Sequence, residues 1–461
     1  MFLELALDDT IAAIATPAGE GGLAVVRVSG PRALEVAGAV FRGSVALTQV
    51  ASHTLHHGWL GDAARSDERI DEVVAAVFRA PASYTREDVV ELSCHGGRLP
   101  AQRTLAALLA AGARLAGPGE FTLRAFLNGR IDLVQAEAVA ELIGARSDAM
   151  HRAALSRLAG EMSRDLRARR EEIADLLAEV EARVDFAEDV GGIEVPAAVL
   201  QRIATARAGL DARLRGAAWA RALREGVQVV IAGPPNAGKS SLFNRLVGED
   251  RAIVTAVPGT TRDRVSATLE LEGALFTLSD TAGLREGGDE VEVLGIERTR
   301  HALAESQVVV WVVDGSTALL AASLPPAGAL AGKRAVVVLN KQDLGAACDE
   351  GALVAALGAD GCGVVRASAR TGAGAEAVAA ALVRAAGFEP GDVLASERQA
   401  LVLARACEAL ARAGEQGGAG APGEIVALEL RDALRALEEL LGMHASEDLL
   451  DRIFARFCVG K

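Results

Sequence analysis

The residues most clearly arranged for chemistry form a phosphate-binding pattern in the middle of the chain. Gly233-Pro-Pro-Asn-Ala-Gly-Lys-Ser240 follows an apolar run and precedes a helix-like segment. Small residues let backbone N–H groups turn inward around phosphate oxygens, and the N-terminus of the following helix adds positive potential. The lysine would reach the β- and γ-phosphates, and the serine hydroxyl would bind Mg²⁺. We therefore expect a nucleoside triphosphate site that includes Asn236, Ala237, Gly238, Lys239, Ser240 and Ser241.

Two later patterns predict which base is bound. In Asn340-Lys-Gln-Asp343, the last carboxylate would accept hydrogen bonds from guanine N1–H and the 2-amino group. Adenine offers neither donor and would leave that carboxylate buried and unpaired. The asparagine would brace the loop, the lysine stem would cover the ring, and Ser368-Ala369-Arg370 would place a backbone N–H at guanine O6. The expected GTP site therefore also includes Asn340, Lys341, Gln342, Asp343, Ser368, Ala369 and Arg370.

Lysine is so scarce in this chain that its positions are informative. Lys and Arg together number 48, but lysine occurs at only four positions. A compact ammonium fits between phosphate oxygens, and its thin stem can cover a flat ring where a guanidinium fork cannot. Lys239 and Lys341 stand in these two contexts. Lys333 is predicted to be solvated, and the residues alone give no role for Lys461.

The residues that would activate water are less clearly marked. Asp280-Thr-Ala-Gly283 ends a predicted strand; its carboxylate can hold Mg²⁺ through water, and its glycine N–H can sense a γ-phosphate. Leu284 follows, where Ras-like enzymes place a water-orienting Gln. A monovalent cation held by Asn236 can take the place of an arginine finger. Chemistry alone does not choose a water-orienting carboxylate, nor does it exclude a merely solvated acidic loop, among Glu286, Asp289, Glu290 and Glu292.

The elements that must position these residues are predicted from three kinds of sequence pattern along the chain. Short apolar runs and Gly-rich turns up to about residue 125 predict strands at 23–28, 72–78 and 88–93 and a helix at 31–40. Amphipathic helical patterns cover 166–184 and 199–223 and return after 388, where 414–423 looks like a loop and Gly442 ends a helix. Between them, apolar strands alternate with helices, as in a parallel sheet, at 227–232, 307–313, 335–339 and 364–367.

These three patterns predict a multidomain chain in which one domain is inserted into another. We expect an α+β N-terminal domain at 1–128, a helical domain in two halves at 129–224 and 389–461, and an inserted α/β P-loop G domain, Ras-like in fold, at 225–388. The net charge of −14 argues against a broad basic face for nucleic acid. Five cysteines without a Cys-x-x-Cys, an acidic start and no membrane-like run favour a cytoplasmic protein.

Beyond these motifs, six stretches of the sequence resemble one known family. They are Val257-Pro-Gly-Thr-Thr-Arg-Asp263, residues 280–298, the segment 9–30 around Arg27, residues 83–97 and 118–132, and the tail Phe457-Cys-Val-Gly-Lys461. The G-domain motifs are similar to those of the TrmE–Era group of GTPases. The whole set resembles the MnmE (TrmE) family of tRNA wobble-uridine modification GTPases. The resemblance covers nearly the whole chain, with gaps around 41–70 and 315–335.

For the G domain, this resemblance implies two switch segments and a potassium ion. Glu292 would orient the water, and Thr261 would bind both Mg²⁺ and the γ-phosphate, Mg²⁺ being shared with Ser240. Potassium would be held by Asn236 and by a loop that supplies Thr255, Val257 and Thr260, so that the catalytic set becomes Glu292, Asn236 and Thr261. The switch residues expected at the nucleotide are Thr255, Ala256, Val257, Pro258, Gly259, Thr260, Thr261, Asp280, Thr281, Ala282 and Gly283.

For the N-terminal domain, the resemblance implies a site for 5-formyl-tetrahydrofolate. Its contacts carry over to Arg27, Glu91, Arg130 and Lys461, with Arg130 in place of a lysine seen in relatives. Cys458 would lie near the one-carbon unit. From the residues alone, an arginine inside an apolar run such as Arg27 is more often explained by a structural salt bridge.

The resemblance further implies a homodimer that works with the flavoprotein MnmG on tRNA. The pair would install an aminomethyl-type group at C5 of the wobble uridine, using the folate-derived carbon. Two other functions stay open at this point. One is a GTP-switched ribosome-assembly factor of the Era-like group, although this chain has no appended basic RNA-binding module. The other is a folate-binding scaffold with incidental GTPase activity.

Overall fold

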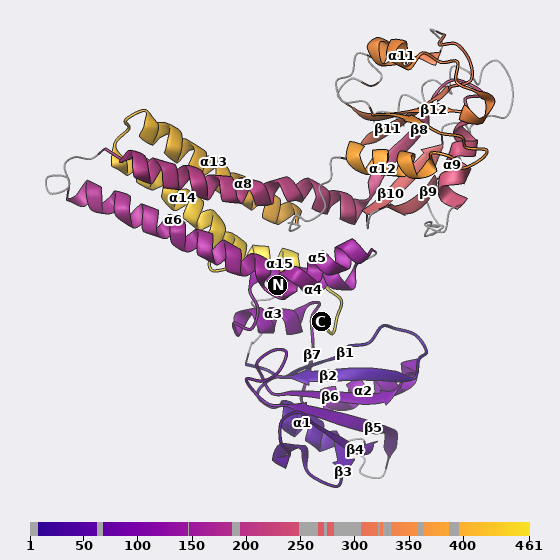
Figure 1. The fold of residues 1–461 in the computed structure, drawn as a ribbon. Helices are drawn as coiled ribbons and strands as arrows, with labels where there is room; N and C mark the ends of the chain where they lie inside the picture. Colours follow the sequence, from indigo (N-terminus) through magenta and orange to yellow (C-terminus); the bar gives the residue numbers. More distant parts are fainter. Residues whose placement is uncertain are drawn as a thin grey trace. The chain divides into compact units, whose positions relative to one another are not determined.

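The structure is a computed structural model, and its helices and strands are shown in Figure 1. By their internal contacts the residues divide into two units, one made of 1–144, 155–200 and 412–461, the other of 145–154 and 201–411. The residues that the structure describes are 8–61, 68–145, 147–186, 194–248, 266–271, 274–280, 306–320, 323–325, 330, 333–357, 363–386 and 396–461.

The N-terminal part of the first unit is a seven-stranded sheet in the order β3-β4-β5-β6-β2-β1-β7. Neighbouring strands are antiparallel except for β1 and β7, which are parallel. Side chains alternate across β2, so that Ala24, Val26 and Val28 are buried under helices α1 and α2. The elements are β1 (Ile11–Ile14), β2 (Leu23–Ser29), α1 (Ala33–Val40), β3 (Phe41–Gly43), β4 (Thr54–Gly61), β5 (Arg69–Phe78), β6 (Val89–His95), α2 (Arg98–Ala110) and β7 (Arg114–Leu115).

The predicted strands at 23–28, 72–78 and 88–93 and the predicted helix at 31–40 are confirmed as β2, β5, β6 and α1. The strand expected before the glycine turn, in the strand–turn–strand pattern of residues 9–30, is confirmed as β1. The other strands of the sheet were not predicted. β3 and β7 are only three and two residues long, too short to show a period. β4 carries His56, His57 and two glycines, so its apolar alternation is weak.

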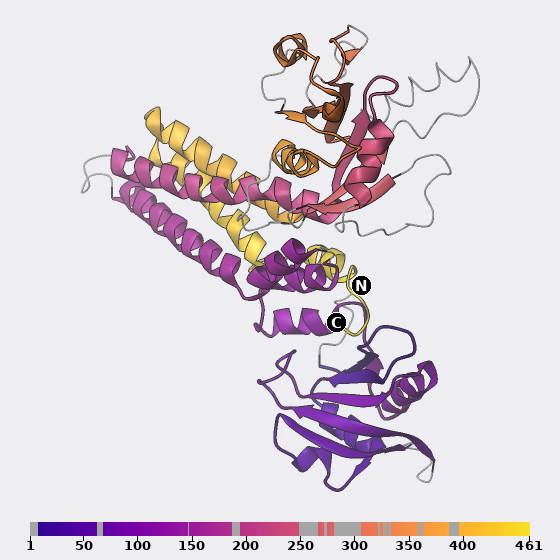
Figure 2. The same cartoon turned by 45° about the vertical axis from the view of Figure 1, so that its right-hand side comes forward.

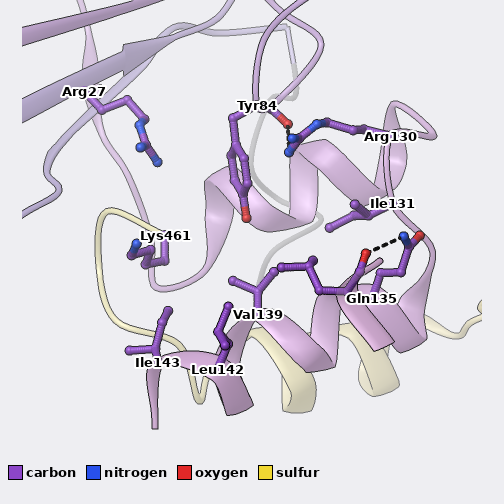
Figure 3. Close-up of a pocket in the computed structure, with 10 residues that line it drawn as sticks. Arg27, Tyr84, Arg130, Ile131, Gln135, Val139, Leu142, Ile143 and Lys461 are labelled. Atoms are coloured by element: carbon purple, nitrogen blue, oxygen red, sulfur yellow. Dashed lines mark hydrogen bonds between the residues drawn. The ribbon is translucent and has the colours of Figure 1, made fainter. Parts of the chain in front are cut away.

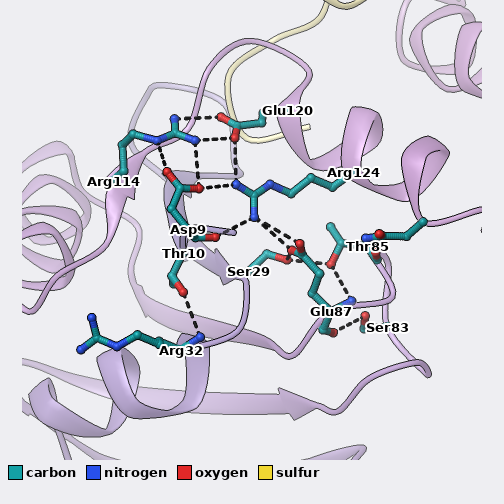
Figure 4. A network of polar contacts seen from close by, with 11 residues as sticks. Asp9, Thr10, Ser29, Arg32, Ser83, Thr85, Glu87, Arg114, Glu120 and Arg124 are labelled. Carbon is teal, nitrogen blue, oxygen red and sulfur yellow. Dashed lines mark hydrogen bonds and ion pairs between the residues drawn. The ribbon is translucent and has the colours of Figure 1, made fainter. Parts of the chain in front are cut away.

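A buried ionic cluster joins this sheet to helix α3 (Glu120–Leu127). We call Asp9, Glu87, Arg114, Glu120 and Arg124 the Arg124 cluster (Figure 4). The Arg124 side chain is 1% exposed, and its Nη2 donates to Asp9 Oδ1 at 2.6 Å and to Glu120 Oε1 at 3.0 Å. Its Nη1 donates to the Asp9 carbonyl at 2.8 Å and lies 3.2 Å from Glu87 Oε1. Three carboxylates thus meet two guanidinium groups at the point where β1, β7 and α3 come together.

The helical part of the same unit is built around α6 (Glu161–Asp185) and α14 (Gly423–Leu441), which lie side by side in Figures 1 and 2. They run antiparallel, because Arg170 pairs with Glu438 at 2.9 Å and Glu181 with Arg431 at 2.6 Å. The predicted helices at 166–184 and up to Gly442 are confirmed, and Gly442 has φ +81°. The same unit contains α4 (Leu133–Ile143) and α15 (Glu447–Phe454), whereas α5 (Asp148–Leu158), α8 (Ala197–Glu225) and α13 (Glu397–Gly418) are each divided between the two units.

The predicted loop at 414–423 is wrong for its first half, since α13 continues to Gly418. One glycine of this stretch, Gly417, serves packing. A Cβ on Gly417 would lie 2.5 Å from Leu200 Cδ2, so a glycine lets the two helices approach closely. The break comes later, at Gly420, where φ is +76°.

The G domain in the second unit is a six-stranded sheet in the order β13-β12-β11-β8-β10-β9, parallel except for the antiparallel pair β9–β10. Helices α9 and α12 pack on one face through Leu242, Phe243, Val378 and Leu382. The predicted parallel strands are confirmed within one residue. The elements are β8 (Val227–Ala232), α9 (Lys239–Gly248), β9 (Ser266–Leu271), β10 (Ala274–Asp280), β11 (Val308–Asp314), β12 (Arg334–Asn340), α11 (Glu350–Leu357), β13 (Gly363–Arg366) and α12 (Ala375–Ala385).

Across the described ranges, no helix has both the length and the apolar character that crossing a membrane requires.

Candidate functional site

The phosphate-binding loop connects the end of β8 to the start of α9, and two of its positions can only be glycine. Gly233 has φ +145°, and a Cβ there would lie 2.2 Å from the Val312 carbonyl oxygen. Gly238 has φ +93°, and a Cβ there would lie 2.2 Å from Asn340 Nδ2. Close backbone approach at both ends therefore shapes the loop that was predicted from its spacing. The carboxyl ends of β11 and β12 meet the loop at the same edge of the sheet.

Inside this loop, Lys239 folds back onto the backbone. Its Nζ donates to the carbonyl oxygens of Gly233 at 3.0 Å and Pro234 at 2.8 Å. A lysine so placed holds its ammonium over the turn where phosphate oxygens would be bound. Asn236 is exposed and has φ +61°, a conformation that asparagine tolerates better than most residues. Ser240 is the second residue of α9, so its hydroxyl lies at the helix N-terminus.

Asn340 ties three loops together. Its side chain is buried, Nδ2 donates to the Ala237 carbonyl at 2.9 Å, and Oδ1 accepts from the Ala369 N–H at 2.9 Å. The Ala369 N–H is therefore already used, and Ser368 N–H donates to the Ala373 carbonyl. Within the described residues, this leaves the Arg370 N–H as the one amide of that segment available for guanine O6.

The carboxylate of Asp343 is held by its neighbours. Ser368 Oγ–H donates to Oδ1 at 2.5 Å, and Arg370 Nη2 lies 2.8 Å from Oδ2. The hydrogen bond from Ser368, together with the charge and hydrogen bond of Arg370, lowers the pKa of Asp343 below its ordinary value. The group is therefore ionised at neutral pH and acts only as an acceptor, which is the state that reading guanine requires.

Asp314 is a site residue that the sequence reasoning missed. It ends β11 directly opposite Asn340 in the sheet register, and its Oδ2 accepts from Lys341 Nζ at 2.7 Å. Burial raises the pKa of Asp314, but the bonds from Lys341 and Ser316 outweigh it and the net pKa is lowered. Lys341 itself has φ +62°. The only sign of it in the sequence is an acidic residue at the end of a predicted strand. That sign becomes meaningful only when the strand is known to lie next to the one that ends at Asn340.

Part of the predicted site lies outside the described residues. This holds for both switch segments, for Thr261 and for all four candidate water-orienting carboxylates, Glu292 included. The structure does show that β10 ends at Asp280, which pairs in register with Ile231 of β8. Thus Asp280 ends a strand beside the one that leads into the phosphate-binding loop. The predicted residues outside the described part are Thr255, Ala256, Val257, Pro258, Gly259, Thr260, Thr261, Thr281, Ala282, Gly283 and Glu292.

A second site is a cavity of about 400 Å³ in the first unit (Figure 3). It brings together three of the four predicted folate contacts, Arg27, Arg130 and Lys461. The fourth, Glu91, is bonded to Arg27 at 2.8 Å. This cavity is of the size that small-molecule sites have, and one of its walls is apolar. The apolar residues, which the sequence reasoning did not find, are Ile131, Val139, Leu142, Ile143 and Leu158.

Tyr84 is a further lining residue that the sequence reasoning missed. Its ring lies between two guanidinium groups, with the Cζ atoms of Arg27 and Arg130 at 5.5 and 4.7 Å from the ring centroid (Figure 3). Cation–π contacts of this kind hold both arginines at the cavity. The Tyr84 hydroxyl is 3.0 Å from Thr122 Oγ1, which fixes the ring in turn.

The tail reaches this cavity because the N-terminus of α3 holds its backbone. Gly119 N–H donates to the Cys458 carbonyl at 3.3 Å, and Phe121 N–H donates to the Lys461 carbonyl at 3.2 Å. Gly460 has φ +95°, and a Cβ there would lie 2.4 Å from the Ile14 carbonyl, so only glycine fits this passage. Cys458 is exposed, and the residues lining the cavity include Lys461 but not Cys458.

Comparison with known proteins supports one family over the whole chain. Residues 10–130 match the family model of the GTP-binding protein TrmE N-terminus, and residues 133–458 match that of the MnmE helical domain. A "tRNA modification GTPase MnmE" from Symbiobacterium thermophilum is 46% identical over 98% of this chain and 100% of its own length. One of the same name from Moorella thermoacetica is 43% identical over 99% and 100%.

Among solved structures, the FeoB G domain from Methanococcus jannaschii is 25% identical and covers 35% of this chain and 98% of its own, with a TM-score of 0.26. The family assignment does not depend on it, because the sequence matches extend from the N-terminal sheet to the tail. The chain belongs to the MnmE (TrmE) family.

Proposed function

We propose that the chain is a GTP hydrolase that acts in tRNA modification. The observation that carries the GTP assignment is the arrangement around Asn340. This one buried side chain links the phosphate-binding loop to the segment 368–370, beside an ionised Asp343 that can accept the guanine edge. The tRNA role is supported by the shared name of the full-length relatives, tRNA modification GTPase MnmE.

The finer proposal is that GTP hydrolysis drives a homodimer that modifies wobble uridine at C5 together with MnmG. The dimer has a candidate surface, because Leu23, Leu55, Trp59 and Val74 are exposed on the strands of the N-terminal sheet. An apolar sheet face of this kind fits a second copy of the same chain. The test is mass spectrometry of wobble uridines in a deletion strain. Loss of the C5 modification is expected, whereas a ribosome-assembly defect with normal uridines would favour the Era-like alternative.

The described metal ligands fit the proposed ions. Ser240 offers a hydroxyl oxygen at the start of α9, a hard donor that suits Mg²⁺, and Thr261 would complete that pair. Asn236 offers an exposed amide oxygen on the phosphate-binding loop for K⁺, with Thr255, Val257 and Thr260 as the further proposed ligands. When bound, K⁺ supplies the positive charge that an arginine finger supplies elsewhere. Glu292 is the proposed water-orienting residue.

We predict that GTP turnover is faster in K⁺ than in Na⁺ by about tenfold or more, since an arginine finger is worth roughly 10³–10⁵ in rate. Asn236→Gly should abolish the difference. Glycine keeps the positive φ without strain and removes only the amide. Steady-state phosphate release in matched chloride salts measures both. Equal rates in the two salts for the unmodified chain would refute the potassium role.

We further propose that the cavity of Figure 3 binds 5-formyl-tetrahydrofolate. Arg130 and Lys461 would pair with ligand carboxylates, the apolar wall would face the ring systems, and Arg27 with Glu91 would face the pterin. Cys458, which is exposed, would come near the one-carbon unit only with the ligand in place.

In that proposal, Arg130→Ala should weaken folate binding by about tenfold or more, because a hydrogen bond to a charged group is worth about 1.5–3 kcal/mol. Isothermal titration calorimetry with 5-formyl-tetrahydrofolate measures it. Arg103→Ala is the matched control: Arg103 is half-exposed on α2 and does not line the cavity. Undiminished affinity in Arg130→Ala, or an equal loss in the control, would remove the folate assignment.

A further inference from the structure

The carboxylate of Asp343 is occupied from two sides, and the two partners differ in kind. Ser368 is 2% exposed, and its Oγ accepts from the Thr371 N–H at 3.2 Å while donating to Asp343 Oδ1. It is a built-in support of the carboxylate. The Arg370 side chain is 74% exposed, whereas that of Asp343 is 11% exposed. Arg370 therefore approaches Oδ2 from the solvent side, and it can leave without disturbing the core.

The donors that Arg370 presents are those of guanine. A guanidinium is a planar carbon bearing N–H groups that point in parallel toward a carboxylate. The N1–C2–N2 edge of guanine has the same arrangement of two parallel N–H donors. A carboxylate suited to one therefore also suits the other, and both cannot pair fully with Oδ2 at once.

The backbone that carries Arg370 is fixed while its side chain is not. Arg245 of α9 donates from Nε to the Ala369 carbonyl at 3.2 Å and from Nη2 to the Arg370 carbonyl at 2.9 Å. The competing guanidinium is thus anchored within reach of Asp343 at all times. Its movement needs only side-chain rotation at an exposed position.

We propose that the side chain of Arg370 is an internal competitor of guanine. It covers Asp343 when the base site is empty and swings out when GTP or GDP enters. This inference rests on the proposed role of Asp343 as the guanine reader. The competition lowers nucleotide affinity and slows association, and in the empty site it gives Asp343 Oδ2 a charged partner.

The test is the binding of GDP, carrying a fluorescent methylanthraniloyl group on the ribose, to the full-length chain by stopped flow. Arg370→Ala should bind about two- to fivefold more tightly, the range that an exposed ion pair allows, and should associate faster. The ratio between variant and unmodified chain should shrink as salt is raised, because salt screens the exposed pair. Arg366→Ala is the matched control. It also removes an exposed arginine, but this arginine pairs with Glu350. The affinity of the Arg366→Ala variant for the labelled GDP should therefore not rise.

A second set of variants, made in Asp343→Asn, separates the role of Arg370 as a competitor from the role of Asp343 in binding guanine. In Asp343→Asn the ion pair is gone, so adding Arg370→Ala should bring no further gain for xanthosine diphosphate. Unchanged or weaker GDP binding in Arg370→Ala, with a normal xanthine switch in Asp343→Asn, would overturn the competition alone. If Asp343→Asn kept its preference for GDP over xanthosine diphosphate, the guanine reader and the competitor would both be overturned.

Discussion

Asp343→Asn should turn the chain from a guanine-nucleotide into a xanthine-nucleotide enzyme. GTP affinity should fall by roughly 10²–10⁴, because two hydrogen bonds to a charged acceptor are worth about 1.5–3 kcal/mol each. Xanthosine triphosphate should gain by a similar ratio. Xanthine carries a carbonyl oxygen at C2, where guanine carries an amino group, and the new amide N–H₂ can donate to it.

The surroundings of Asp343 predict which way the new amide points. Ser368 Oγ–H donates to Oδ1 at 2.5 Å, so the oxygen of an asparagine would stay on that side. Its N–H₂ then takes the place of Oδ2, which faces Arg370 at 2.8 Å. Two donors would meet there, and Arg370 would be pushed away from the base site. The substitution should therefore switch specificity without unfolding the loop that Asn340 and Arg245 hold.

The measurement is competition of GTP and xanthosine triphosphate for the same site, read as the ratio of dissociation constants. Asp314→Asn is the matched control, since it makes the same chemical change at a neighbouring carboxylate, the one at the end of β11. Asp314 anchors Lys341 at 2.7 Å rather than reading the base edge. That control should weaken both nucleotides alike and leave their ratio unchanged. A ratio that moved equally in both variants would mean that Asp343 does not read the base.

The backbone of the candidate nucleotide site was largely predictable because its motifs are local in sequence. The spacing from Gly233 to Ser240 predicts a turn, in which close contacts with the Val312 carbonyl and the Asn340 side chain require glycine at two positions. The positions of the strands follow from apolar runs of ordinary length. Asp314 was not predictable in the same way. It becomes a partner of Lys341 only because β11 and β12 are paired in parallel, and the sequence of either strand alone does not determine the register of that pairing.

The cavity of the first unit was predictable only by resemblance. Arg27, Tyr84, Arg130 and Lys461 are far apart in sequence and meet through tertiary contacts, namely a cation–π sandwich and a tail held by α3. No period or spacing encodes such a meeting. The same is true of the Arg124 cluster, whose members come from 9 to 124 and which the sequence reasoning did not find.

Arg124→Met should destabilise the N-terminal sheet by about 3–5 kcal/mol. Removing one partner of a buried ion pair leaves the others uncompensated, and here Glu120 is fully buried while Asp9 and Glu87 are partly so. Hydrogen exchange followed by mass spectrometry reports this region by itself. Peptides from β2 and β6 should exchange about 10²–10⁴ times faster, at about 1.36 kcal/mol per tenfold, whereas those from β11 and β12 in the G domain should not change. Arg32→Met is the matched control, because Arg32 and Glu35 form an exposed pair worth about 1 kcal/mol or less.

The pH dependence of this loss separates a charge effect from a packing effect. Burial would raise the pKa values of Asp9 and Glu120, but in the intact cluster hydrogen bonds from Arg114, and for Asp9 also from Arg124, bring both below their ordinary values. Such depressed groups stabilise the fold above their unfolded-state pKa, near 4, and that stability is lost as pH falls through the folded pKa. In Arg124→Met one positive charge is lost while the carboxylates of Asp9 and Glu120 stay desolvated. Their pKa values in the folded state therefore rise, and the folded state binds protons at a higher pH than the intact chain does. The difference in stability between the two chains should therefore be greatest at pH 7 and shrink as the pH falls toward and below about 4, through the lowered pKa values of the intact cluster. A difference that stays constant over this range would show that Arg124 acts by filling space and not by its charge.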